Sequence, residues 1–159
     1  MPKRSAYIYI ILLLFMKKIE FVSSRLVREP AFEYAPKIEN KEDAVQCVSD
    51  LFSDWDREVV GVINLSVKGK VLNASVVSIG CLNGSLVHPR EVFKSAILSS
   101  ANSLIMFHTH PSGDINPSKE DFEVTEKIHQ AGWILGIQML DHIIIAHDEI
   151  FSFREMGLL

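Results

Sequence analysis

The sequence predicts an α/β fold in which helices flank a single mixed β-sheet. Short β-branched or apolar runs, at residues 58–67, 70–80 and 103–110, alternate with longer segments of helical periodicity. The last of these runs is almost wholly apolar, as expected for a central strand that is covered on both faces. The chain has 159 residues, of which 48% are hydrophobic and 23% charged, so we expect one domain with one sheet.

The first 40 residues are predicted to be an extension that precedes this domain. Residues 6–16 form an apolar run after a basic start, but a bilayer span needs about 20 apolar residues and no small-residue cleavage site follows. Two interpretations stay open, namely a misassigned start ahead of Met16 and a short membrane-associating segment. Residues 18–27 then alternate like an edge strand, and residues 28–40 form a connection that contains proline.

The domain itself is predicted to span residues 41–159. Its first helix follows Asn40 as N-cap, and the strands at 58–67 and 70–80 form a hairpin through a tight turn at Gly69. The second helix begins near Pro89 and precedes the apolar strand. The third helix ends at Gly132 or Gly136, and two final strands occupy residues 137–146 and 150–153.

Charge and cysteine content narrow the classes of function. The formal net charge is −4, and basic residues form no stripe of the kind that binds a phosphate backbone, so nucleic acid is not an expected partner. Cys47 and Cys81 stand alone, which indicates neither a disulfide framework nor a thiolate metal site. We therefore expect a cytoplasmic protein without a stable membrane span. The oligomeric state is not predicted by these features.

The polar side chains that follow the apolar strand predict a metal site. His108 and His110 are two residues apart at the end of the strand, so both imidazoles point to the same face. A turn then leads to Ser118, which is placed to cap the next helix, and Asp121 lies in its first turn, where it can aim back at the histidines. Two imidazole nitrogens and one carboxylate, with the fourth tetrahedral position left to water, form the ligand set of a catalytic zinc.

Each part of this pattern also has a simpler interpretation. Ser118 and Asp121 alone would indicate only a capping box, and the intervening Pro-Ser-Gly-Asp alone would indicate only a turn. The combination favours a metal site, because histidines that leave so apolar a strand are poorly explained as surface residues. From the residues alone, the predicted chemistry extends to metal-assisted hydrolysis of a carbonyl-like centre.

The stretch HTHPSGDINPSKED fits the pattern H-x-H-x7-S-x2-D, which is the motif of the JAB/MPN metallopeptidases, also called JAMM proteins. Together with LVHPREVF before it and LDHIIIA and FSFREMGLL after it, the segment from about Asp43 to the C-terminus resembles the RadC-like JAB family of bacteria. The resemblance implies the JAB/MPN fold, which has a cytidine-deaminase-like architecture. It also implies Zn²⁺ held by His108, His110 and Asp121.

The resemblance further implies a peptidase or isopeptidase whose partner is a peptide or protein substrate. A glutamate of the family deprotonates the zinc-bound water, and Glu58 matches it at the start of an E-V-x-G strand, whereas Glu91 is the rival candidate. Ser118 matches the motif's serine and would donate a hydrogen bond to the developing oxyanion.

Two alternatives to the peptidase function stay open. One is a DNA-repair-associated accessory protein, although the helix-hairpin-helix-like region of longer members is not expected here, and the other is a non-catalytic scaffold for protein partners.

Asp141 and His142 form a second polar feature, inside the predicted strand at residues 137–146. They belong to the same resemblance, but polar residues in an apolar strand usually satisfy each other or the backbone. We therefore expect a buried, hydrogen-bonded pair that supports the fold, without a metal ligand among its members.

Overall fold

The computed structural model describes residue 23 and residues 37–49, 57–80 and 87–159. The predicted edge strand at residues 18–27 and the apolar run at residues 6–16 lie outside these ranges, apart from Ser23. The elements of the described residues are, in chain order, α2 (Lys41–Ser49), β1 (Val59–Leu65), β2 (Val71–Ile79), α3 (Pro89–Leu98), β3 (Ser103–Thr109), α4 (Lys119–Leu135), β4 (Gln138–Ala146) and β5 (Glu149–Ser152).

These strands form one mixed sheet of five strands in the order β2-β1-β3-β4-β5. β3 and β4 run parallel, and every other neighbouring pair is antiparallel. β3 lies at the centre, and six of its seven residues are buried, as its apolar sequence predicts. Because parallel strands cannot be joined by a tight turn, α4 provides the crossover between β3 and β4. The predicted class, a single mixed sheet with flanking helices, is confirmed.

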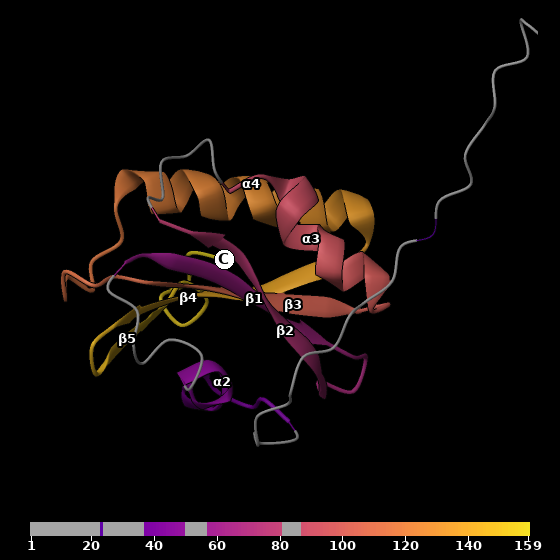
Figure 1. Ribbon diagram of the computed structural model, residues 1–159, viewed down its shortest axis with the longest axis horizontal. Helices are drawn as coiled ribbons and strands as arrows, with labels where there is room; N and C mark the ends of the chain where they lie inside the picture. The colour runs from indigo at the N-terminus through magenta and orange to yellow at the C-terminus, as the bar shows by residue number, and fades with distance from the viewer. Residues whose placement is uncertain (1–22, 24–36, 50–56, 81–86) are drawn as a thin grey trace, which may run out of the picture.

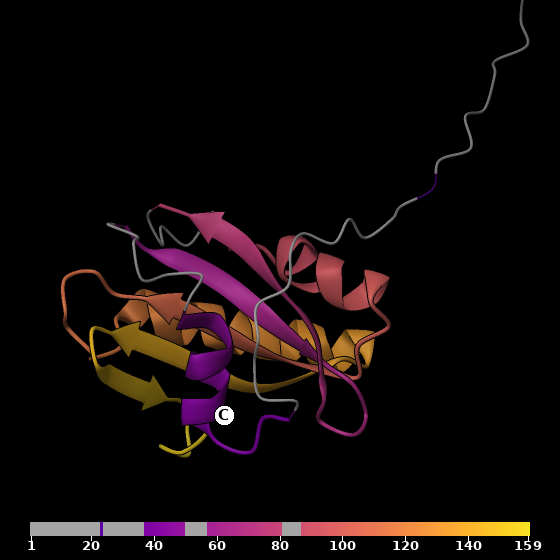
Figure 2. The ribbon, with the colours of Figure 1, turned by 60° about the horizontal axis from the view of Figure 1, so that its bottom comes forward.

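Helices cover both faces of the sheet. Figure 1 shows α3 and α4 side by side over one face, with α2 on the opposite face. In Figure 2, α2 lies against the side of the sheet that carries β4 and β5. The larger core fills the space below α3 and α4 and includes Val60, Val62, Phe93, Met106, Val124 and Ile128. The smaller core lies under α2 and includes Ala44, Val48, Ile63, Ile105, Phe107 and Ile143.

The helices begin and end at capping residues. The Asn40 side chain accepts an amide hydrogen bond at the start of α2 at 2.7 Å, and His88 does the same for α3 at 3.2 Å. α4 ends at Gly136, which has a left-handed backbone with φ 68°. Gly132, the other predicted end, lies within the helix, where a Cβ would approach the Ile137 carbonyl oxygen to 2.6 Å. None of the helices in the described ranges is long and apolar enough to cross a bilayer.

Gly61 provides a test of the packing between β1 and β3. It pairs with Phe107 of β3, and a Cβ at this position would lie 2.3 Å from Phe107 Cζ. We therefore expect Gly61→Ala to lower the free energy of unfolding by about 1–3 kcal/mol, measured by urea denaturation. Phe107→Leu removes the ring atoms that clash, so the double variant should lose less than the sum of the two single losses. Strict additivity would contradict this contact.

Candidate metal centre

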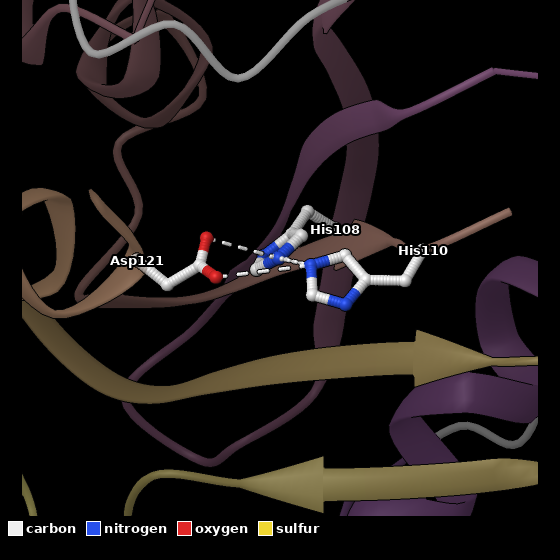
Figure 3. A group of neighbouring side chains, drawn as sticks. All are labelled: His108, His110 and Asp121. Carbon is white, nitrogen blue, oxygen red and sulfur yellow. Dashed lines mark hydrogen bonds and ion pairs between the residues drawn. The ribbon is translucent and has the colours of Figure 1, made fainter. Parts of the chain in front are cut away.

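The two histidines are positioned by β3. His108 has no exposed surface, and it is the antiparallel partner of Val60 in β1. His110 follows two residues later on the same face and is mostly buried, and its amide donates a hydrogen bond to the Ile145 carbonyl oxygen at 2.8 Å. This bond extends the β3–β4 pairing past the last strand residue of β3. As a result, both imidazoles point to the same place, next to the start of α4 (Figure 3).

Asp121 comes from the first turn of α4, where the capping box predicted with Ser118 is present. Asp121 Oδ2 accepts hydrogen bonds from the Ser118 backbone amide at 2.7 Å and from the Ser118 hydroxyl at 2.6 Å. In return, the Asp121 amide donates to Ser118 Oγ at 3.2 Å. The carboxylate is only 1% exposed, and this cap holds it in place facing the histidines.

The three predicted ligands meet. The two Nε2 atoms of His108 and His110 are 2.8 Å apart. Asp121 Oδ1 lies 3.2 Å from His108 Nε2, and Oδ2 lies 3.7 Å from His110 Nε2. In a tetrahedral zinc site with bonds of about 2.0–2.1 Å, neighbouring ligand atoms are about 3.3 Å apart. Among the described residues, this is the group of histidine, cysteine and acidic side chains that could hold a metal ion.

The protonation of the site also fits a cation. His110 Nδ1 lies 2.6 Å from the Asp114 carbonyl oxygen, which can only accept, so Nδ1 carries a proton and Nε2 is the ring nitrogen that faces the site. Burial lowers the pKa of His108 to about 4, so that this ring is neutral at pH 7. A carboxylate buried beside the neutral ring of His108 is costly unless a cation compensates its charge. A metal ion bound by all three side chains would do so.

Glu58, the preferred candidate for the base, directly precedes β1 and is half-buried. The backbone amide that follows it donates to Thr109 Oγ1 at 3.0 Å, which ties this end of β1 to the end of β3. Val60 pairs with His108, and side chains directly opposite each other in antiparallel strands share a face. Continued by two residues, this register puts Glu58 opposite His110 and on the face of the metal ligands.

Glu91, the rival candidate, has a different environment in the first turn of α3. Its carboxylate contacts Lys94 one turn further along the helix, and Arg90 Nε at 3.6 Å. The hydrogen bond from Lys94 lowers the pKa of Glu91. These contacts tie the Glu91 carboxylate to cations on the surface of its own helix.

The loop between His110 and α4 is supported by a contact that the sequence did not indicate. Gly113 has a φ of 80°, and a Cβ there would lie 2.7 Å from the ring of His147, which follows β4. Asp114, whose carbonyl holds His110, accepts hydrogen bonds at its carboxylate from the amide and the side chain of Asn116. The orientation of His110 therefore depends on the backbone of this loop.

Asp141 and His142 are buried and hydrogen-bonded, as predicted. Asp141 Oδ1 accepts a hydrogen bond from the backbone amide of His142 at 2.8 Å, and Asp141 Oδ2 accepts one from the hydroxyl of Ser152 at 2.6 Å. The His142 ring, however, makes a contact that the sequence did not predict, because its Nε2 lies 2.8 Å from His108 Nδ1. Thr125 was also missed. It lies one turn after Asp121, and this spacing on the helix is the one signal that could have indicated it.

Comparison with known proteins identifies the family. The model of the RadC-like JAB domain matches residues 38–158. The chain belongs to the RadC-like JAB family. Among curated relatives, it is similar to a UPF0758 protein of Chlorobium chlorochromatii (strain CaD3), with 46% identity over 117 residues, which are 74% of this chain and 53% of the relative. A UPF0758 protein of Desulfitobacterium hafniense (strain DSM 10664 / DCB-2) is 46% identical over 124 residues, 78% of this chain and 55% of the relative.

The resemblance predicted from the motif is thus confirmed, and the observed sheet is consistent with the JAB/MPN fold. This RadC-like JAB chain spans about half the length of the curated relatives that it matches. The family match begins at residue 38, and Ile38 already packs against the smaller core. The domain boundary after residue 40 stays a prediction, as do the roles of the individual site residues.

Elemental analysis would test the metal site directly. We expect about one zinc per chain in protein supplied with zinc, and we expect His108→Ala and Asp121→Ala each to weaken zinc binding by more than about 100-fold. The reason is that even changes outside the ligand shell cost 10–100-fold. His88→Ala, which removes a histidine that caps α3, is the matched control and should keep its zinc. Full zinc content in either ligand variant would contradict the assignment.

Proposed function

We propose that this protein is a zinc-dependent hydrolase of the JAMM type that cleaves peptide or isopeptide bonds in a peptide or protein substrate. The observation that carries the proposal is the convergence of His108, His110 and Asp121 on one point. The β1–β3 register, if extended by two residues beyond Val60, would put Glu58 on the same face. A zinc ion at this point would polarise the scissile carbonyl and lower the pKa of a water molecule to about 7.

In this proposal Glu58 is the general acid and base. Its carboxylate accepts a proton from the attacking water and then donates that proton to the nitrogen of the leaving amine. Two features support this role. The backbone after Glu58 is tied to Thr109, between the two histidines, and the rival Glu91 is engaged by cations of α3.

Ser118 is proposed to donate a hydrogen bond to the oxyanion that forms on the substrate. The residue is exposed, so a substrate can reach its hydroxyl. That hydroxyl donates to Asp121 Oδ2, and it would have to turn toward the substrate oxygen. The Ser118 backbone amide also donates to Asp121 Oδ2, so the carboxylate would keep one of its two hydrogen bonds from this residue during the turn.

A non-catalytic scaffold for protein partners is the second candidate, and family membership is equally consistent with it. The specific observation in its favour is the apolar surface at the end of α4, where Trp133 is 83% and Ile134 84% exposed. Large apolar side chains exposed next to each other often mark sites of protein–protein contact. Membership of the RadC-like JAB family is equally consistent with the DNA-repair-associated accessory role, which no separate observation on the described residues favours.

Replacement of the proposed base separates catalysis from metal binding. Glu58→Gln keeps the shape of the side chain but cannot accept the proton, so we expect hydrolysis of peptide and isopeptide substrates to fall by about 10²–10⁴-fold while zinc content is retained. Glu91→Gln is the matched control and should keep its activity. Cleavage is measured with fluorogenic substrates and zinc by elemental analysis on the same samples.

The opposite results are equally informative. If Glu91→Gln lost activity and Glu58→Gln kept it, the role of base would pass to Glu91. If zinc-loaded wild-type protein cleaved neither class of substrate, the scaffold would replace the hydrolase as the favoured function.

A further inference from the structure

His142 is a fully buried histidine to which the proposed mechanism gives no role. Its ring lies between two polar partners, with Nε2 2.8 Å from His108 Nδ1 and Nδ1 2.6 Å from Thr125 Oγ1. The ring has no exposed surface, and its two partners are an imidazole and a hydroxyl rather than a carboxylate, an environment that favours the neutral ring with a single proton. The question is which of its two nitrogens holds that proton.

Thr125 answers this question, because its hydroxyl has only one hydrogen. That hydrogen is donated to the main-chain carbonyl oxygen of Asp121 at 2.6 Å, and a carbonyl oxygen can only accept. Toward His142, Thr125 Oγ1 must therefore act as the acceptor. The proton of His142 is consequently on Nδ1, and its Nε2 has a lone pair.

The direction of the hydrogen bond between His142 and His108 follows from the position of the His142 proton. Since His142 Nε2 is an acceptor, His108 Nδ1 must be the donor across their 2.8 Å contact. With its proton on Nδ1, His108 has none on Nε2, which is the atom 3.2 Å from Asp121 Oδ1 and 2.8 Å from His110 Nε2. The two Nε2 atoms then face each other without a proton between them, which is the arrangement expected where a cation lies between them. The hydrogen bonds run in one direction, from His108 through His142 and Thr125 to the main chain of Asp121.

We infer that Thr125 and His142 are positioning residues of the metal centre, which fix His108 in the tautomer that presents an unprotonated Nε2 to a metal ion. The chain of hydrogen bonds begins at one proposed ligand and ends at the residue that carries another, so it also ties β3 to the first turn of α4. This inference rests on the proposed metal site for its consequence, but not for the direction of the hydrogen bonds.

The two histidine ligands are oriented by different means. His110 donates its Nδ1 proton to the carbonyl of Asp114, in an exposed loop. His108 depends on a side-chain relay whose members are all buried. Removal of the Thr125 hydroxyl would leave His142 Nδ1 without an acceptor. The His142 proton would then move to Nε2, and the His108 proton would move to its own Nε2, where it blocks the metal.

The test uses the zinc-free full chain with ¹⁵N-labelled histidine, because long-range ¹H–¹⁵N spectra report which ring nitrogen carries the proton. In wild-type protein we expect His108 and His142 as Nδ1–H tautomers. In Thr125→Val we expect His108 to change to Nε2–H and zinc affinity to fall by about 10–100-fold. Thr125→Ser restores the hydroxyl and should restore the wild-type tautomer and a zinc affinity within about threefold of wild type.

Ser95→Ala is the matched control. It removes a hydroxyl that accepts a hydrogen bond from the buried Asn64 on the same face of the sheet, at 3.0 Å, outside the relay. A purely structural effect of losing a hydroxyl would appear in this variant too, whereas we expect it to keep both tautomers and the zinc affinity.

The possible results separate this inference from the proposed function. An Nε2–H tautomer of His108 in wild-type protein, or an unchanged tautomer in Thr125→Val, would overturn the relay, whatever the zinc affinity. Wild-type protein that has the expected tautomers but binds no zinc would support the relay and remove the zinc hydrolase. The expected tautomers together with the loss of zinc affinity in Thr125→Val alone would support both.

Discussion

The parallel pairing of β3 with β4 is the constraint on which the site depends. Parallel neighbours need a crossover, so the chain that leaves β3 must turn and run back as α4 before β4 begins. The end of β3 and the first turn of α4 are therefore adjacent. His108 and His110 come from the strand end and Asp121 from the helix start, so all three side chains come from one short segment, which the pairing with β4 holds in place.

Burial of the Asp121 carboxylate beside the His108 ring would be unfavourable without the hydrogen bonds that surround the two side chains. The carboxylate and one imidazole are fully removed from water, which is costly for polar groups that lack partners. The capping box of α4 satisfies Asp121, and the relay through His142 and Thr125 satisfies the inner face of His108. The atoms that this network leaves without a hydrogen-bond donor or acceptor are His108 Nε2, His110 Nε2 and Asp121 Oδ1, which face one another. Such a group of inward-facing atoms is expected of a cation site.

The site has an inner side, formed by the buried His108, and an outer side, formed by His110 and the residues nearer to solvent. His108 has no exposed surface, and its Nδ1 contacts the equally buried His142. His110, Ser118 and Glu58 lie nearer to solvent, and the surface loop after β3 supports the outer ligand. In the part of the chain that the structure describes, the outer side is therefore the one that a substrate of the proposed hydrolase could reach. This asymmetry suits a hydrolase, because the rigid inner ligand would keep the metal in place while the exposed groups meet the substrate.

Much of the fold, and the convergence of the three candidate ligands, was predictable from the sequence because both are local properties. The strands follow from runs of apolar residues, the helix starts from their caps, and the triad from a motif of 14 residues, from His108 to Asp121, that spans one strand end, one turn and one helix start. Whether α4 ends at Gly132 or Gly136 needed the structure, since both are glycines at plausible ends and packing alone decides which one is buried.

Tertiary structure decided the features that join distant segments. The register between β1 and β3 pairs Val60 with His108, and β1 and β3 are separated by 37 residues in the sequence. The proposed position of Glu58 on the face of the histidines is an extension of this register. The contact of His142 with His108 spans 34 residues, and that of Thr125 with His142 spans 17. By itself, the sequence determined which side chains are available for the chemistry. The alignment of β1, β3, β4 and α4 determined which of them meet, because strand register and helix packing depend on the whole sheet rather than on any one segment.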